Sequence, residues 1–269
     1  MSYDRPMAPR SAHRSQSVPT SKPWTVRTPT RPLRPAVQSR ALPLTRRFEI
    51  EWLDADGFIQ DATRIAPALP AFEEAFAAFA HGTLIQTLEG PVAVEDLAPG
   101  AELATADGET APLMWKGAIT VVPGAPTLRD TPEKLYRVTA DAFGLGRPAR
   151  DVLLGPDARL LTRDPSVRAA VSADAAYVPV SSLADGVSVI EVNPVNPMRV
   201  YHLHTGRHHT ILAGGLEIET FAPRASMPES LSHEMMAVFL TLFPHLATLR
   251  DFGRARWPRM SREMMDGVH

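Results

Sequence analysis

Glycines divide residues 82–223 into short apolar runs, and this pattern constrains the fold more than any other feature of the sequence. The runs are rich in Val, Ile, Leu and Thr, and turns such as Pro99-Gly100 and Asp107-Gly108 separate them. Short apolar runs between turns are typical of β-strands, whereas a helix needs about ten or more periodic residues. We therefore expect an all-β domain. The expected strands are Thr83–Thr87, Val92–Leu97, Glu102–Thr105, Pro112–Val122, Tyr136–Ala140, Val152–Leu154, Arg159–Thr162, Tyr177–Pro179, Val187–Val192 and Val200–Leu212.

Composition excludes several classes of protein. The 269 residues include no cysteine, so the chain has no disulfides, no thiolate metal ligands and no cysteine nucleophile. No apolar run approaches the roughly 18 residues that a membrane-spanning helix needs, and the N-terminus lacks the apolar core of a secretory signal. We therefore expect a cytoplasmic protein without a transmembrane segment.

Residues 1–47 differ from the rest of the chain in charge and proline content. They carry ten Lys and Arg residues against the single acid Asp4, and eight of the 26 prolines. The remaining residues carry 18 basic and 29 acidic side chains. Because proline interrupts both helices and strand ladders, we expect a disordered, polyproline-like tail. The tail is either a solvated segment or a contact for an anionic partner such as nucleic acid or anionic lipid.

The segment 48–80 precedes the expected β domain. Apolar and polar residues alternate on both sides of Asp54-Ala55-Asp56-Gly57, which predicts a hairpin. The acids of this turn lack the further ligands and the closing Glu of a calcium loop, so we interpret them as turn residues. From Pro67 to Phe79 the apolar residues have helical spacing, and we expect a short helix there.

The segment 224–269 follows the expected β domain, which spans residues 81–223. Ser226 and Glu229 have the spacing of a capping box, and they precede a methionine-rich apolar face at helical spacing. We expect this segment to be helical and to pack outside the β domain.

Three sequence blocks follow one another along the expected β domain. The first is Ala78-Phe79-Ala80-His81-Gly82-Thr83-Leu84-Ile85, followed by Val94-Glu95-Asp96-Leu97-Ala98-Pro99-Gly100-Ala101. The second is Leu153-Leu154-Gly155-Pro156-Asp157-Ala158-Arg159-Leu160. The third comprises Tyr201-His202-Leu203, Arg207-His208, Ile211, Gly214 and Glu219-Thr220-Phe221-Ala222-Pro223. In this order the blocks resemble the bacterial branch of the Hint family, the domain shared by hedgehog autoprocessing modules and inteins.

This resemblance implies a mainly β fold, a Hint-like horseshoe of short strands with internal pseudo-twofold symmetry, to which the flanking segments add short helices. For active members it implies an N-to-S acyl shift. The first cysteine attacks the carbonyl of the preceding residue, and a second-block histidine protonates the departing amide nitrogen. The matching positions here are Ala78 and Ala158. Because a methyl group neither attacks a carbonyl nor transfers a proton, we expect no self-cleavage.

The sequence departs from the family pattern at two further positions. Gly155 stands where the family has a small polar residue, and Ala101 stands where it usually has an acid. Among nearby polar residues, Thr83 lies five positions beyond Ala78, so its hydroxyl cannot reach the same bond through the same five-membered ring. His81 is interpreted as a surface histidine.

A run of histidines extends from Tyr201 to Leu212. If Thr205-Gly206 forms a two-residue turn, His202 and His204 share one face of a hairpin and His209 lies opposite His202. Three imidazoles on one face are a candidate zinc or nickel site. The run contains no Asp or Glu to orient the imidazoles, so we interpret them as exposed or core histidines and expect no cofactor. The candidate binding residues matched by the family are Arg207 and His208.

The leading hypothesis is a catalytically inactive Hint-like domain that serves as a binding or scaffold module for an unknown protein partner. One alternative is an enzyme, with residual autoprocessing or hydrolysis through Thr83 or a histidine metal site. The other alternative makes residues 1–47 the active part, in contact with nucleic acid or another anionic surface.

Overall fold

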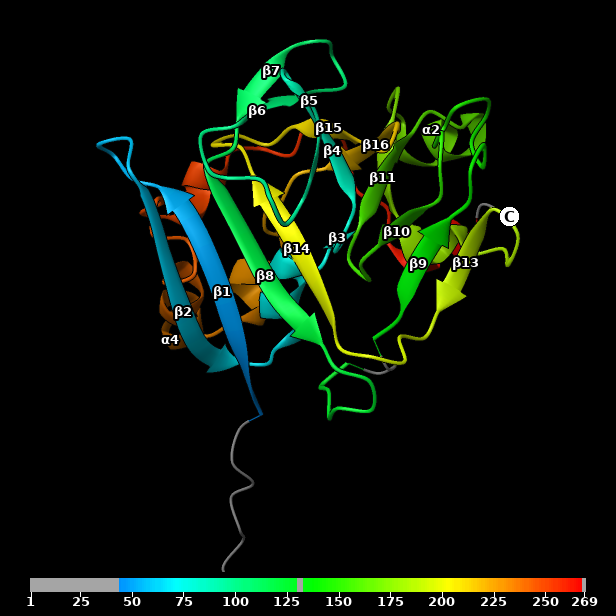
Figure 1. The fold of residues 1–269 in the computed structure, drawn as a ribbon. Helices are drawn as coiled ribbons and strands as arrows, with labels where there is room; N and C mark the ends of the chain where they lie inside the picture. The colour runs from blue at the N-terminus through cyan, green and yellow to red at the C-terminus, as the bar shows by residue number, and fades with distance from the viewer. Residues whose placement is uncertain (1–43, 130–132, 268–269) are drawn as a thin grey trace, which may run out of the picture. The chain divides into compact units, whose positions relative to one another are not determined.

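Two antiparallel sheets make up the folded body in this computed structural model, which describes residues 44–129 and 133–267 (Figure 1). The first sheet has the strand order β13-β9-β10-β3-β14-β8-β1-β2. The second has the order β12-β11-β16-β15-β4-β6-β7, and β5 pairs with β4. This architecture confirms the mainly β, Hint-like fold class. The tail prediction falls almost entirely on residues 1–43, which lie outside the described residues.

The strands are short, in agreement with the spacing of the glycines. The strands of the first sheet are β1 (Thr45–Leu53), β2 (Ile59–Pro67), β3 (Phe79–Ala80), β8 (Trp115–Val121), β9 (Leu135–Val138), β10 (Val152–Leu154), β13 (Val189–Val192) and β14 (Met198–His204). Those of the second are β4 (Leu84–Thr87), β5 (Gly90–Ala93), β6 (Glu102–Ala104), β7 (Thr110–Pro112), β11 (Arg159–Thr162), β12 (Ala176–Pro179), β15 (Thr210–Ala213) and β16 (Leu216–Glu219).

The helices are one or two turns long and lie mostly in the flanking segments. They are α1 (Pro70–Glu73), α2 (Pro165–Val171), α3 (Met227–Ser230), α4 (His233–Leu240) and α5 (Arg262–Asp266), with 3-10 helices η1 (Glu74–Phe76), η2 (Val180–Leu183) and η3 (Leu249–Phe252). Within the described residues, no helix has the length and apolar character needed to cross a membrane.

The N-terminal hairpin is part of the first sheet. β1 and β2 pair from Thr45↔Pro67 to Leu53↔Ile59, across the turn where the alternation of apolar residues predicted a reversal. The Asp54 carboxylate accepts hydrogen bonds from the backbone of Asp56 and Phe58, which closes that turn. On its other edge β1 pairs with β8, so the hairpin extends the sheet. β1 begins at Thr45, inside the range assigned to the tail.

The helix expected from Pro67 to Phe79 is shorter than the apolar spacing predicted. β2 continues to Pro67, and the helical part ends with η1 at Phe76. The next residues are extended because Phe79 pairs with β10 on one side and with β14 on the other. Strand pairing therefore overrides local helical spacing at the segment that carries Ala78.

The capping box expected at Ser226 is wrong. Ser226 makes no side-chain capping hydrogen bond, and α3 is a single turn. The Ser232 side chain caps α4 instead, by accepting a hydrogen bond from the Met235 backbone. A capping box does form further on, where Thr248 and Asp251 cap η3.

Two hydrophobic clusters make up most of the core. The first contains Ala78, Ala158 and residues of both sheets. The second joins the two flanking segments to β8, and Figure 1 shows α4 beside the β1–β2 hairpin. Its large side chains are Phe48, Phe72, Phe76, Trp115, Phe221, Phe239, Phe243 and Phe252. Residues before and after the family-like region therefore share one aromatic core.

Candidate functional site

The peptide bond between residues 77 and 78 is buried and held by backbone hydrogen bonds. The Ala77 carbonyl accepts from the Asp157 amide at 2.9 Å, and the Ala78 amide donates to the Tyr201 carbonyl at 2.9 Å. The Ala78 carbonyl accepts from the Gly155 amide at 2.8 Å. Both alanines have no exposed surface. The first, second and third sequence blocks thus meet at this one bond.

Gly155 allows the second block to pack directly on this bond. A Cβ at position 155 would lie 2.3 Å from the Ala77 oxygen and 2.7 Å from the Ala77 carbonyl carbon. Both contacts are with backbone, which cannot rotate away as a flexible side chain can. Any side chain at this position therefore requires the 77–78 bond to move.

Ala158 lies one residue after Asp157 in the same turn. Its side chain is buried, and it lines a groove of about 410 Å³ between the second block and the C-terminal segment.

A cluster of charged side chains lies at the groove beside Ala158, and three of its members, Arg129, Glu133 and Asp157, line the groove. Arg129 forms a two-pronged ion pair with Asp157, at 2.6 and 3.0 Å, and also contacts Glu73 at 3.1 Å. Arg46 pairs with Glu73 and Glu133. Burial opposes the charge of Arg129, but the pairs with Asp157, Glu73 and Glu133 outweigh it and raise the pKa of Arg129. Sequence analysis missed this cluster because its members come from distant segments.

The two polar candidates near the bond are engaged elsewhere. Thr83 is buried, and its hydroxyl donates to the Leu153 carbonyl at 2.8 Å. His81 is exposed, and its Nε2 lies 3.3 Å from a Glu95 carboxylate oxygen. Neither side chain makes a hydrogen bond to Ala77 or Ala78 within the described part of the chain.

The histidine hairpin expected between residues 200 and 212 is wrong. β14 pairs with β8 and β3 in the first sheet, whereas β15 pairs with β16 and β4 in the second. The histidines therefore take different partners. His202 accepts a hydrogen bond from the Leu203 amide, His204 contacts His245 at 3.0 Å, and His209 contacts the Thr205 hydroxyl. Among residues 44–129 and 133–267, no three His, Asp or Glu side chains are grouped to hold a metal ion.

Burial keeps two of these histidines neutral. Loss of solvation lowers the pKa of His202 well below its ordinary value of 6.5. The same effect, reinforced by the neighbouring His245, lowers the pKa of His204 to about 3. Both side chains are therefore core residues, which is one of the two interpretations that the sequence allowed.

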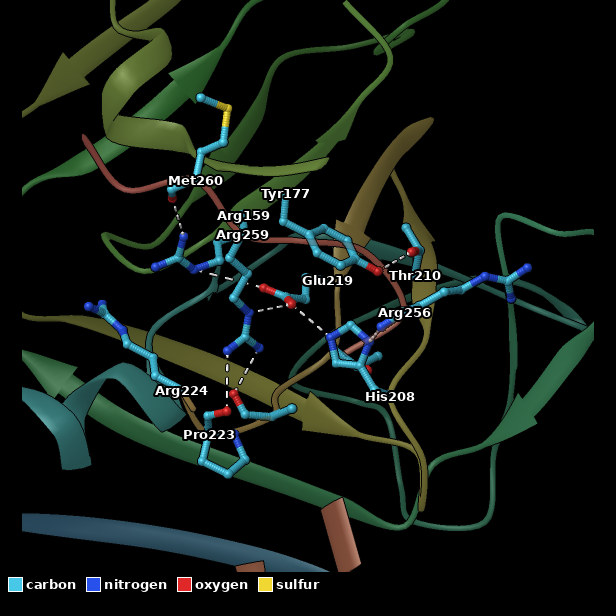
Figure 2. Close-up of polar contacts among 12 residues, drawn as sticks. Arg159, Tyr177, His208, Thr210, Glu219, Pro223, Arg224, Arg256, Arg259 and Met260 are labelled. Atoms are coloured by element: carbon cyan, nitrogen blue, oxygen red, sulfur yellow. Dashed lines mark hydrogen bonds and ion pairs between the residues drawn. The ribbon is translucent and has the colours of Figure 1, made fainter. Parts of the chain in front are cut away.

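His208 belongs to a buried polar network centred on Glu219 (Figure 2). The Glu219 carboxylate lies 2.7 Å from both His208 Nε2 and Arg259 Nε, and 3.8 Å from Arg159. Arg259 also donates to the carbonyls of Ala222 and Pro223. The other residue of the Arg-His match, Arg207, is exposed. The sequence pointed to His208 but not to its carboxylate partner, although Glu219 stands in the third block.

Comparison with known families identifies the class of this protein. Residues 77–225, more than half of the chain, match the family model of the Hint domain. The chain therefore belongs to the Hint domain family. A solution structure of a bacterial intein-like domain from Clostridium thermocellum is similar to it, with 16% sequence identity and a TM-score of 0.36. That similarity covers 54% of this chain and 99% of the other. No curated protein matches the chain.

Proposed function

We propose that this Hint domain is catalytically silent and serves as a binding or scaffold module. The observation that carries the proposal is the state of the 77–78 bond, which is a buried, hydrogen-bonded internal peptide bond. The acyl shift needs a nucleophile at residue 78 and a proton donor near residue 158, and both positions hold a methyl group. The methyl groups supply neither function.

The segment before the bond supports the same proposal. An autoprocessing domain separates itself from the residues that precede its nucleophile. Here those residues include β1, which pairs with β8, and Phe76, whose ring lies 5.1 Å from that of Trp115. Cleavage after Ala77 would cut through the aromatic core and divide one sheet between two fragments. A domain retained for binding benefits from such a continuous, rigid body.

The enzyme alternative through Thr83 has less support. A hydroxyl nucleophile needs a base that accepts its proton, and the Thr83 hydroxyl donates to a backbone carbonyl, which cannot do so. Asp157 is the acid nearest in sequence to Ala158, but it is held in the ion pair with Arg129. These contacts leave the bond without an activated group.

Restoration of the two missing groups tests the proposal. The variant Ala78→Cys with Ala158→His should cleave between residues 77 and 78 when a thiol is added, because the Asp157 amide already donates to the Ala77 carbonyl oxygen. Residue 158 borders the groove, and we expect the imidazole to extend into it. Cleavage is measured by mass spectrometry after denaturation, together with each single variant and the wild type.

The test compares four proteins: the double variant, the two single variants and the wild type. We expect cleavage in the double variant, much less in either single variant, and none in the wild type. Circular dichroism of the uncleaved double variant confirms that it is folded. Equal cleavage of the wild type and the double variant would contradict catalytic silence, and a folded double variant that stays intact would show that more than the reactive groups has changed.

A further inference from the structure

A second, larger groove lies next to the one that Ala158 lines. It has a volume of about 860 Å³, and the two grooves share Arg159, Arg224 and Ser261 as lining residues. Most of its lining comes from residues 226–261, which follow the segment matched by the Hint family model. The larger groove is therefore built mainly by this chain's own C-terminal extension.

Arginine dominates the lining of this groove. Among the described residues that line it, six are arginines and none is acidic: Arg159, Arg224, Arg250, Arg254, Arg256 and Arg259. Figure 2 shows four of these arginines around the Glu219 network. The groove is called the arginine groove below.

Carboxylates outside the groove neutralise only part of this charge. Glu219 pairs with Arg259 and lies near Arg159, Glu74 pairs with Arg224, and Asp107 pairs with Arg256. Three carboxylates thus form ion pairs with four of the six guanidinium groups. Arg250 and Arg254 are both exposed, and neither side chain has a hydrogen bond or ion pair with another described residue. The arginine groove therefore carries excess positive charge at two unpaired side chains.

Apolar surface lies between the arginines. Leu249, Pro228, Met260 and Trp257 also line the groove, and Trp257 is partly buried against Leu161, Ala175 and Tyr177. Tryptophan and arginine are enriched among the interface residues that contribute most of the binding free energy between proteins. The groove presents both, because Trp257 lies between arginines. A ligand for this groove should combine acidic groups with apolar side chains.

The size and charge of the groove narrow the choice of ligand. A single phosphate or carboxylate fills only a small part of 860 Å³. Residues 1–47 carry the same sign of charge as the groove, so they do not complement it. A nucleic acid would extend beyond the groove over a body in which acids outnumber bases by 29 to 18, and its phosphates would be repelled there. A short acidic peptide can lie within the groove without extending over that acidic surface.

We propose that the arginine groove binds an acidic peptide segment of a partner protein. Arg250 and Arg254 pair with its carboxylates, and Trp257 contacts its apolar side chains. This inference rests on the proposed binding function, to which it adds a place and a class of partner.

A peptide-binding titration on the full-length protein tests the inference. The probe is a fluorescein-labelled peptide of Glu and Leu residues, long enough to span the groove, and binding is followed by fluorescence anisotropy. The control peptide has Gln in place of every Glu. The test variant is Arg250→Gln with Arg254→Gln, which removes no side-chain hydrogen bond or ion pair among the described residues. The control variant is Arg64→Gln with Arg150→Gln, which removes the same charge from exposed arginines that do not line the groove.

The expected result is binding of the Glu peptide that weakens by about fivefold to tenfold in the test variant and stays within about twofold in the control variant. The Gln peptide should bind far more weakly. Absence of binding, or equal loss in both variants, would overturn the inference. So would groove-dependent binding of a single-stranded oligonucleotide without binding of the Glu peptide. The intact mass of the same preparation reports separately on catalytic silence, so the two proposals can fail independently.

Discussion

At position 155, the absence of a side chain is what lets the second block rest on the 77–78 bond. Gly155→Ala would place a Cβ 2.3 Å from the Ala77 oxygen, and only a backbone shift would relieve that contact. We expect the free energy of unfolding to fall by about 1–3 kcal/mol, as for other overpacked core positions. Urea denaturation followed by circular dichroism measures the change.

Gly267→Ala is the matched control for this substitution. A Cβ at residue 267 would meet its nearest neighbours at 3.6 Å or more, which is ordinary contact. The control should stay within about 0.5 kcal/mol of the wild type. Equal stability of the two variants would show that the second block does not pack on the bond as described.

Individual residues also differ in how far their role in the site could be predicted from the sequence. Ala78 and Ala158 could be located because the motif residues around them are local in sequence. The reason why position 155 holds a glycine could not be predicted, because the Ala77 carbonyl that it contacts lies 78 positions earlier. Glu219 could be recognised only as a residue of the third sequence block. Its pairing with His208 could not be predicted, because it depends on how β16 lies beside residues 205–209.

At the scale of elements, β16 holds the C-terminal segment through the carboxylate of Glu219. Burial raises the pKa of Glu219, but the hydrogen bond from His208 and the charge of Arg259 outweigh it, and the net pKa is lowered below 4.5. A carboxyl group whose pKa is lower in the folded state stabilises the fold above its unfolded pKa. That contribution is lost as the pH falls through the lowered folded pKa.

Glu219→Gln should therefore destabilise the fold in a pH-dependent way. At pH 7 the free energy of unfolding should fall by about 3–5 kcal/mol, because Arg259, whose side chain is only 15% exposed, loses its carboxylate partner. The difference from the wild type should shrink as the pH falls below the unfolded-state pKa and through the lowered pKa of the folded state, where Glu219 itself takes up a proton. Urea titrations between pH 7 and pH 3 measure both values.

Glu217→Gln is the control for this prediction, because Glu217 lies on the same strand and pairs with the half-exposed Arg163. Its effect should stay below about 1 kcal/mol. A Glu219→Gln effect that is constant from pH 7 to pH 3 would mean that the ionised carboxylate does not hold the segment.

The elements themselves could largely be predicted, but their partners could not. Glycine spacing located most of the strands, although not β3 or β16, and apolar alternation located the β1–β2 hairpin. A two-residue turn at Thr205-Gly206 suggested a second hairpin, and that was wrong because β14 and β15 join different sheets. Alternation shows that a strand has a buried face, whereas the choice of neighbour depends on the packing of the whole domain.

At the scale of the whole molecule, the flanking segments are part of the domain's core. Phe48 and Phe76 from the N-terminal side pack with Phe243 from the C-terminal side and with Trp115 of β8. The sequence predicted that these segments are structured, but not that they share one cluster. Such contacts join residues more than 150 positions apart, and no local pattern records them.

This shared core determines how catalytic silence must be measured. If the 77–78 bond were cut, the pairing of β1 with β8 would hold the fragments together, so a native mass or an elution volume would not reveal the cut. Denaturation before the measurement is essential. The most direct test is the intact mass of the purified wild-type chain in denaturant, after several days at pH 7–8, with and without dithiothreitol or hydroxylamine.

A silent Hint domain should give the full-length chain of 29.4 kDa under every condition, because no nucleophile or proton donor stands at the bond. A pair of fragments that end at Ala77 and begin at Ala78, and that increase with time or with added thiol, would contradict the account.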